Sequence, residues 1–175
     1  MKFLRNKLFL VGAVCVAPVL LGWALYLSGW TPAATGNYGE LIAPRPLSGP
    51  PLEGSRGKWV LVSFDAAGCD AYCERKLYFM RQVRKAQGKE FERIERLWVV
   101  GGPGAPRPEV LAAIEGTRVE RVNDPAFRKS FPGNPVDHIY LVDPLGNLML
   151  RYPRDPDPAK MVKDLQRLLK YSRIG

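Results

Sequence analysis

The sequence predicts an α/β domain with a mostly parallel β-sheet, preceded by one N-terminal apolar helix. Two observations support this prediction. Residues 8–27 form an uncharged apolar run, and after residue 57 short apolar runs alternate with stretches of helical periodicity. Strands that alternate with helices usually pair in parallel, with the helices covering the sheet. The chain has 175 residues, which is enough for one ordinary domain behind the apolar segment.

The apolar run predicts an uncleaved membrane anchor. Its 20 residues are enough to cross a hydrocarbon core about 30 Å thick as a helix. Lys2, Arg5 and Lys7 precede the run, and no charge follows it before Glu40. The positive-inside rule then places the N-terminus in the cytoplasm and the rest of the chain outside. A cleaved signal peptide is the alternative, but its apolar core would be shorter, about 7–15 residues.

We therefore expect four parts. Residues 1–7 are a basic cytoplasmic tail, 8–27 the transmembrane anchor, 28–56 a Pro/Gly-rich linker, and 57–175 an exported domain. The formal net charge of +9 is typical of a solvated, mildly basic surface, and the chain carries no nucleic-acid-binding motif. Nucleic acid is not an expected partner.

The exported domain reads as an alternation of strands and helices. We expect strands at 59–64, 97–100, 119–122, 138–142 and 148–152, and helices at 70–87, 108–114, 123–131 and 158–170. The last two strands form a hairpin, which we expect to add an antiparallel edge to the sheet. On the helix at 70–87, Arg75 and Lys76 are expected to face water. This is the order of a three-layer thioredoxin-like domain.

Cys69 and Cys73 are the most informative residues. They stand where the first strand of the domain ends and its helix begins. Thiols four residues apart on a helix share one face, and a helix start favours the thiolate. We expect the pair to be exposed. Such a pair exchanges disulfides or holds a soft metal ion.

A metal site needs a third ligand, and His138 is the single histidine of the chain. Cu(I) accepts two thiolates and an imidazole, so a three-ligand copper site requires Cys69, Cys73 and His138 together. Structural zinc usually takes four ligands, for which the chain lacks a full set unless carboxylates such as Asp70 or Asp137 join. The alternative is that His138 is an ordinary histidine at a strand end.

Disulfide exchange is the rival chemistry. Cys69 lies nearer the helix start and would attack, and Cys73 would resolve the mixed disulfide. Pro135, in a cis peptide bond, would supply the proline that usually faces such a site. A purely structural disulfide is a third reading. Two residues four apart in a helix lie near the upper limit of Cα separation, so we expect such a bond to be strained.

The stretch from Gly57 to about Lys170 resembles the SCO/SenC family. The resemblance rests on the pattern Phe64-x4-Cys69-x3-Cys73-x3-Leu77 and on Val136-Asp137-His138 leading into Tyr140-Leu141-Val142-Asp143-Pro144-Leu145-Gly146. Glu74 stands where that family usually has proline, so the chain resembles a divergent member. The family consists of membrane-anchored, thioredoxin-like proteins that assemble cytochrome c oxidase, with a copper site made of the two cysteines and a downstream histidine.

The resemblance implies a cytochrome c oxidase assembly factor of the bacterial inner membrane with a periplasmic domain. It would bind Cu(I) through Cys69, Cys73 and His138, or reduce acceptor cysteines for copper insertion, with a respiratory oxidase subunit as partner. Two alternatives remain open. One is a general periplasmic thiol–disulfide oxidoreductase, and the other is a non-catalytic scaffold for respiratory-complex assembly. Whether the chain is an enzyme stays open with them.

Overall fold

A computed structural model of the chain describes residues 2–28, 36–47 and 49–174. The chain divides into two compact units, residues 1–36 and residues 37–175. The first contains the helix α1, Lys2–Leu27. Its segment Leu10–Leu27 has a mean hydropathy of 2.2 and is long and apolar enough to cross a membrane. The predicted anchor therefore lies on a helix with the required length and composition. Residues 29–35 of the predicted linker lie outside the described part.

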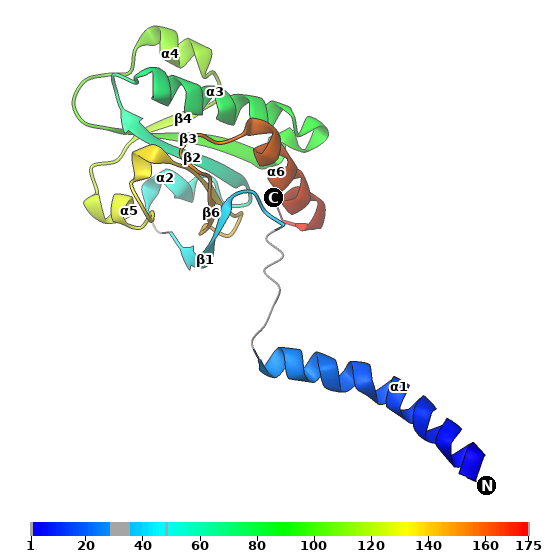
Figure 1. Cartoon of the computed structure of the whole chain (residues 1–175). Coiled ribbons are helices and arrows are strands. Elements are labelled where there is room, and N and C mark those ends of the chain that lie inside the picture. Colours follow the sequence, from blue (N-terminus) through cyan, green and yellow to red (C-terminus); the bar gives the residue numbers. More distant parts are fainter. Residues whose placement is uncertain (1, 29–35, 48, 175) are drawn as a thin grey trace. The chain divides into compact units, whose positions relative to one another are not determined.

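The second unit is a six-stranded sheet with helices on both faces (Figure 1). In chain order its elements are β1 Glu40–Pro46, α2 Pro50–Glu53, β2 Trp59–Ala66, α3 Ala71–Lys85, η1 Gly88–Arg93, β3 Ile94–Gly101, α4 Pro108–Ala113, β4 Arg118–Arg121, α5 Pro125–Lys129, η2 Pro135–Asp137, β5 Ile139–Val142, β6 Asn147–Arg151 and α6 Pro158–Tyr171. Every strand and helix that the sequence predicts in the domain is present, with ends that differ by a few residues.

The sheet is mixed, so the prediction of a mostly parallel sheet is wrong in that detail. The strand order is β1-β6-β5-β2-β3-β4. β2 pairs in parallel with β3, and β3 with β4, but β2 pairs antiparallel with β5, β5 with β6, and β6 with β1. The hairpin of β5 and β6 lies inside the sheet because β1 covers its outer side. The sequence had placed that hairpin at the edge.

β1 is the main departure from the sequence prediction, which assigned residues 28–56 to a linker. Glu40 is opposite Arg151 and Pro46 opposite Asn147, so this segment is an edge strand of the sheet. Proline is tolerated on an edge strand because the outer side of that strand has no neighbouring strand that needs its backbone N–H group. Its proline content therefore suggested a linker where the chain forms a strand.

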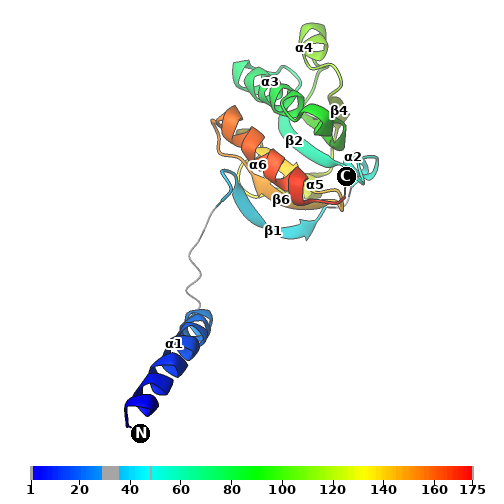
Figure 2. The ribbon, with the colours of Figure 1, turned by 90° about the vertical axis from the view of Figure 1, so that its right-hand side faces the viewer.

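Two apolar layers hold the sheet between its helices. α3 and α6 lie side by side on one face of the sheet (Figures 1 and 2). Both helices bury aliphatic side chains in a cluster with Trp98 and Leu61. The other face buries an aromatic cluster in which Phe64 contacts Phe131 and Tyr140 edge-on. Because β2 is buried along nearly its whole length, the segment that follows it starts from a fixed position.

Asp164 of α6 fixes the start of the folded unit. This carboxylate is 4% exposed and accepts hydrogen bonds from the backbone N–H groups of Tyr38 (2.9 Å) and Gly39 (2.8 Å). These bonds hold the residues just before β1 against α6. A buried carboxylate that accepts backbone N–H groups compensates its own desolvation and satisfies donors that would otherwise be unpaired.

We predict that Asp164→Ala lowers the free energy of unfolding of the full-length chain by about 2–3 kcal/mol, because charged hydrogen bonds are lost and buried N–H groups remain. Urea unfolding followed by tryptophan fluorescence in detergent would measure this. Limited proteolysis should also cut before β1 more readily. Lys163→Ala, at the exposed neighbouring position of α6, is the control and should change stability by less than about 0.5 kcal/mol. Equal effects of the two substitutions on stability would contradict the role of Asp164 in fixing the start of the folded unit.

Candidate functional site

The site lies at the carboxyl end of β2, where the chain turns into α3. The backbone N–H of Cys69 donates to the carbonyl of Ala66 (3.1 Å), closing a tight turn. Cys69 has φ +38°, the one non-glycine residue with positive φ in the described part of the chain. Asp70 then caps α3, its carboxylate accepting from the N–H of Cys73 at 2.9 Å. A side-chain cap of this kind stabilises a helix start by about 1 kcal/mol.

Cys69 and Cys73 form a disulfide with a Cα–Cα distance of 5.2 Å. The sequence argument for strain treated the two cysteines as residues four apart in one helix. That expectation is wrong, because Cys69 lies before the cap residue and only Cys73 is helical. The left-handed turn at Cys69 brings the two Cα atoms well within the range of ordinary disulfides, about 4.4–6.8 Å.

The pair is less exposed than expected. Cys69 is 2% and Cys73 1% exposed. Both belong to the buried apolar cluster on the α3 face of the sheet, and both are among the residues that line an open cavity of about 550 Å³. The other lining residues are Asp65, Ala66, Gly68, Asp70, Tyr72, Val136, Asp137 and Arg154.

A buried ion pair lies beside the disulfide. The Lys76 ammonium is 2.9 Å from Asp65, and the side chains are 1% and 8% exposed. Lys76 also donates to the carbonyl oxygens of Phe64 and Val136, and Ser63 donates its hydroxyl to Asp65 (2.9 Å). Burial raises the pKa of Asp65 and the Lys76 charge opposes that rise. Burial likewise lowers the pKa of Lys76 against the Asp65 charge.

This pair corrects the sequence prediction that Lys76 faces water. Lys76 follows Cys73 by three residues and precedes Leu77, so it lies beside the apolar stripe of α3. A lysine so close to the buried stripe was the available signal. The partner could not be read from the sequence, because Asp65 lies on another element.

Tyr72, between the cysteines, bridges two segments across the cavity. Its hydroxyl donates to the carbonyl oxygens of Asp137 (2.8 Å) and Arg154. Burial, with the charges of Asp155 and Asp137, raises the pKa of Tyr72 to about 12, so the hydroxyl stays protonated at neutral pH. Tyr72 is a site residue that the sequence analysis did not single out.

His138 lies at the start of β5 and does not line the disulfide cavity. Its Nδ1 is 2.8 Å from the carbonyl oxygen of Tyr152, and its ring meets Tyr140 edge-on at 5.9 Å between centroids. Within the described residues, no three His, Cys, Asp or Glu side chains are grouped so as to hold a metal ion. The structure thus brings Cys69 and Cys73 together, whereas the ring of His138 is hydrogen-bonded to the carbonyl of Tyr152. Pro135 begins η2, and the described residues contain no cis peptide bond.

We predict that Lys76→Met lowers the free energy of unfolding by about 3–5 kcal/mol, because the Asp65 carboxylate stays buried without its partner. The double variant Asp65→Leu/Lys76→Met should recover most of this loss. Urea unfolding of the full-length chain would measure both. Arg75 lies on the same helix as Lys76 and makes a surface ion pair with Asp155. Arg75→Met removes this pair and should lower the free energy of unfolding by no more than about 1 kcal/mol. A Lys76→Met cost as small as that of Arg75→Met would refute a stabilising role of the pair.

The domain shares its fold with solved structures of Sco proteins. Copper-bound Sco1 from yeast has a TM-score of 0.60 and 15% identity, over 78% of this chain and 94% of that one. BsSco, a member of the Sco family of cytochrome c oxidase assembly proteins in which a disulfide switch is identified, has a TM-score of 0.53 and 17% identity, over 78% of this chain and 96% of that one. Copper-bound ScoI from Bradyrhizobium japonicum has a TM-score of 0.50 and 20% identity, over 66% and 87%.

These similarities confirm the predicted thioredoxin-like fold and the resemblance to Sco proteins at the level of fold. No curated protein matches this chain in sequence. Residues 59–172 match the family described as "Transmembrane-like, thioredoxin-like, C-terminal domain". This match spans more than half of the chain and includes both cysteines and His138. The chain therefore belongs to the family of transmembrane-like proteins with a thioredoxin-like C-terminal domain.

Proposed function

We propose that this chain is a membrane-anchored assembly factor for a respiratory oxidase, acting through thiol–disulfide exchange at Cys69 and Cys73. The observation that carries this proposal is the disulfide itself. It lies at the start of α3, and its two cysteines line an open cavity by which a client sulfur would approach. The oxidase is inferred from the resemblance and from the BsSco structure of the same fold.

The exchange step starts from the dithiol. The Cys69 thiolate attacks one sulfur of a client disulfide, the client S–S bond breaks, and the second client sulfur leaves as a thiolate. The Cys73 thiolate then attacks the Cys69 sulfur. The Cys69–Cys73 bond forms and the first client sulfur leaves, so the client gains two electrons and the protein becomes the disulfide seen here. A dithiol donor returns the protein to its reduced state.

Asp65 is our candidate acceptor for the proton that Cys73 loses, because it lines the same cavity as both cysteines. Burial raises the pKa of Asp65, and the Lys76 charge opposes that rise. Lys76 keeps this carboxylate in position. The start of α3 also favours the thiolates, because the unpaired N–H groups of its first turn carry partial positive charge next to the turn that contains Cys69.

The same proposal includes a topology. α1 anchors the chain in a bacterial inner membrane, with residues 1–7 in the cytoplasm and the thioredoxin-like domain in the periplasm. The apolar segment Leu10–Leu27 and the cations that precede it support this orientation. An oxidising compartment suits a protein whose function depends on a disulfide.

Copper handling is the second candidate function, with Cu(I) as the cargo. Copper-bound Sco1 and ScoI have the same fold as this chain. After reduction, Cys69 and Cys73 supply two soft ligands that Cu(I) accepts. His138 remains our proposed third ligand. A carbonyl only accepts hydrogen bonds, so the contact with Tyr152 requires a proton on Nδ1, and the neutral imidazole with that proton has a lone pair on Nε2 for a metal.

We predict that Cys73→Ser traps a mixed disulfide when the reduced full-length chain, in detergent, meets oxidised glutathione. Cys69 attacks, and the missing Cys73 thiol leaves the intermediate unresolved. Intact-mass spectrometry would detect one bound glutathione. The experiment uses a Cys15→Ser background, because Cys15 of α1 is a further free thiol.

Cys69→Ser in the same background is the control and should accumulate far less adduct. A Cys69 thiol that reacts no faster than glutathione itself would end the exchange proposal. Equal trapping by the two variants would contradict the assigned order of attack.

For copper, we predict one Cu(I) per reduced chain in competition with a Cu(I) chelator, lost on Cys69→Ser or Cys73→Ser. His138→Ala should weaken Cu(I) binding by at least about tenfold, the loss that even an outer-shell partner of a metal site can cause. Wild-type affinity in His138→Ala would remove His138 from the site. Absence of binding to the reduced chain would end the copper candidate and leave thiol exchange standing.

A further inference from the structure

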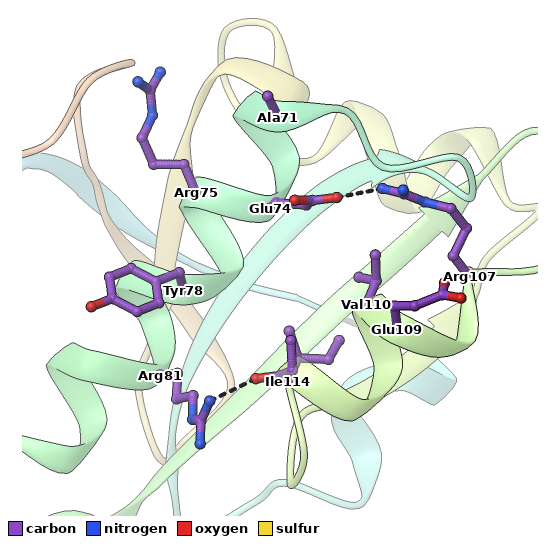
Figure 3. A pocket seen from close by; sticks show the side chains of 10 residues that line it. Ala71, Glu74, Arg75, Tyr78, Arg81, Arg107, Glu109, Val110 and Ile114 are labelled. Carbon is purple, nitrogen blue, oxygen red and sulfur yellow. Dashed lines mark hydrogen bonds and ion pairs between the residues drawn. The ribbon is translucent and has the colours of Figure 1, made fainter.

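Arg107 contacts the turn that carries Cys69. Its guanidinium donates to the backbone carbonyl of Cys69 (2.8 Å) and to the Glu74 carboxylate of α3. Figure 3 shows the second of these contacts, with Arg107 reaching from the start of α4 toward α3. The carbonyl of Cys69 belongs to the peptide bond between Cys69 and Asp70. Arg107 therefore holds the peptide that joins the cysteine turn to the cap of α3.

Cys69 needs such a contact because of its backbone conformation. Its φ of +38° lies in the left-handed region, which residues other than glycine rarely adopt. In the oxidised protein the disulfide constrains this residue, since it ties Cys69 to Cys73. In the dithiol that cross-link is absent, and a rearrangement of the turn would let Cys69 relax to negative φ. The Arg107 contact involves no sulfur atom, so reduction removes neither its donor nor its acceptor.

The loop that carries Arg107 is itself held at both ends. Arg121 of β4 donates to the carbonyl oxygens of Gly102 and Gly104, near the start of the loop between β3 and α4. At the other end Pro108 follows Arg107 and favours the extended backbone found there, with φ −65° and ψ 137°. The guanidinium thus reaches the cysteine turn from a fixed point.

We infer that Arg107 is a positioning residue of the exchange reaction, which keeps Cys69 of the dithiol in the left-handed turn from which the disulfide closes. This inference rests on the proposed exchange function and names a determinant of its equilibrium. A dithiol that already has the closing geometry loses less conformational freedom when the bond forms. Arg107 therefore favours the disulfide and makes it harder to reduce.

The charge of Arg107 would act in the opposite direction. A cation near Cys69 stabilises the thiolate, and so makes the disulfide easier to reduce. This charge is offset by its surroundings, because Glu74 pairs with it, Glu109 lines the same cavity, and the Asp70 carboxylate caps α3 beside the turn. The side chains of Arg107 and Glu74 are also 50% exposed, so water screens them. We therefore assign the effect of Arg107 to geometry.

The test measures the equilibrium constant for closing the Cys69–Cys73 disulfide. Full-length chain with Cys15→Ser, in detergent, is equilibrated with mixtures of reduced and oxidised glutathione. Two electrons and two protons pass from the dithiol to oxidised glutathione, which is released as two molecules of reduced glutathione. Acid quenching, thiol alkylation and intact-mass spectrometry give the fractions of disulfide and dithiol.

We expect Arg107→Met to lower this equilibrium constant about fivefold, the lower end of what holding one left-handed residue is worth. Glu74→Ala removes the second contact of the guanidinium and should lower the constant less. Added to Arg107→Met, it should cause no further loss, because the two residues act through one contact. Urea unfolding checks that each variant is folded, and Glu74→Ala decides the test if Arg107→Met is not.

Arg81→Met is the matched control. Arg81 likewise donates to a backbone carbonyl, that of Ala113 (2.9 Å), and lines the same cavity as Arg107, but it has no contact with the cysteine turn among the described residues. Its loss should leave the equilibrium constant as in the parent chain.

The outcomes separate the two proposals. An unchanged constant in Arg107→Met, in a parent chain that exchanges with glutathione, overturns the positioning role and leaves the exchange function. A raised constant in Arg107→Met means that the charge acts on the thiolate, and it overturns the positioning role as well. A parent chain whose cysteines do not exchange with glutathione overturns the exchange function itself.

Discussion

One buried ammonium group organises the site. Lys76 of α3 reaches Asp65 and the carbonyl of Phe64 in β2, and the carbonyl of Val136 in η2. These three segments carry six of the ten residues that line the disulfide cavity. Burying a charge pair is costly, so its geometry must supply the hydrogen bonds that repay desolvation. Because Lys76 has several acceptors in fixed positions, a shift of any one segment would leave part of this charge unpaired.

The local backbone then sets the relation between the two sulfurs. Cys69 occupies a left-handed conformation that costs a non-glycine residue about 1 kcal/mol or more. The Asp70 cap and the contact of Arg107 with the Cys69 carbonyl hold this conformation. As a result the Cα atoms approach to 5.2 Å, and the bond forms without distortion of α3. A pair built on two turns of one helix would lack this freedom.

The sequence predicts the order of the strands and α-helices from β2 to α6, because these elements show their own periodicity and the helices their start signals. Asp70 before α3 and Pro158 at the first position of α6 are signals of this kind. It does not predict how strands pair, because pairing depends on residues far apart. The antiparallel contact of β5 with β2 and the edge position of β1 are tertiary choices. For the same reason Lys76 was assigned to solvent, since its partner Asp65 belongs to another element.

The two candidate chemistries use the same sulfurs and therefore cannot operate at once. A disulfide has no thiolate to offer Cu(I), so reduction of Cys69–Cys73 must come before copper binding. In the disulfide state His138 is hydrogen-bonded to the carbonyl of Tyr152, and the Tyr72 hydroxyl donates to the carbonyl of Asp137, the residue before His138. The proposed copper route therefore has to bring His138 to the sulfurs from a segment that the Tyr72 and Tyr152 contacts hold in the disulfide state.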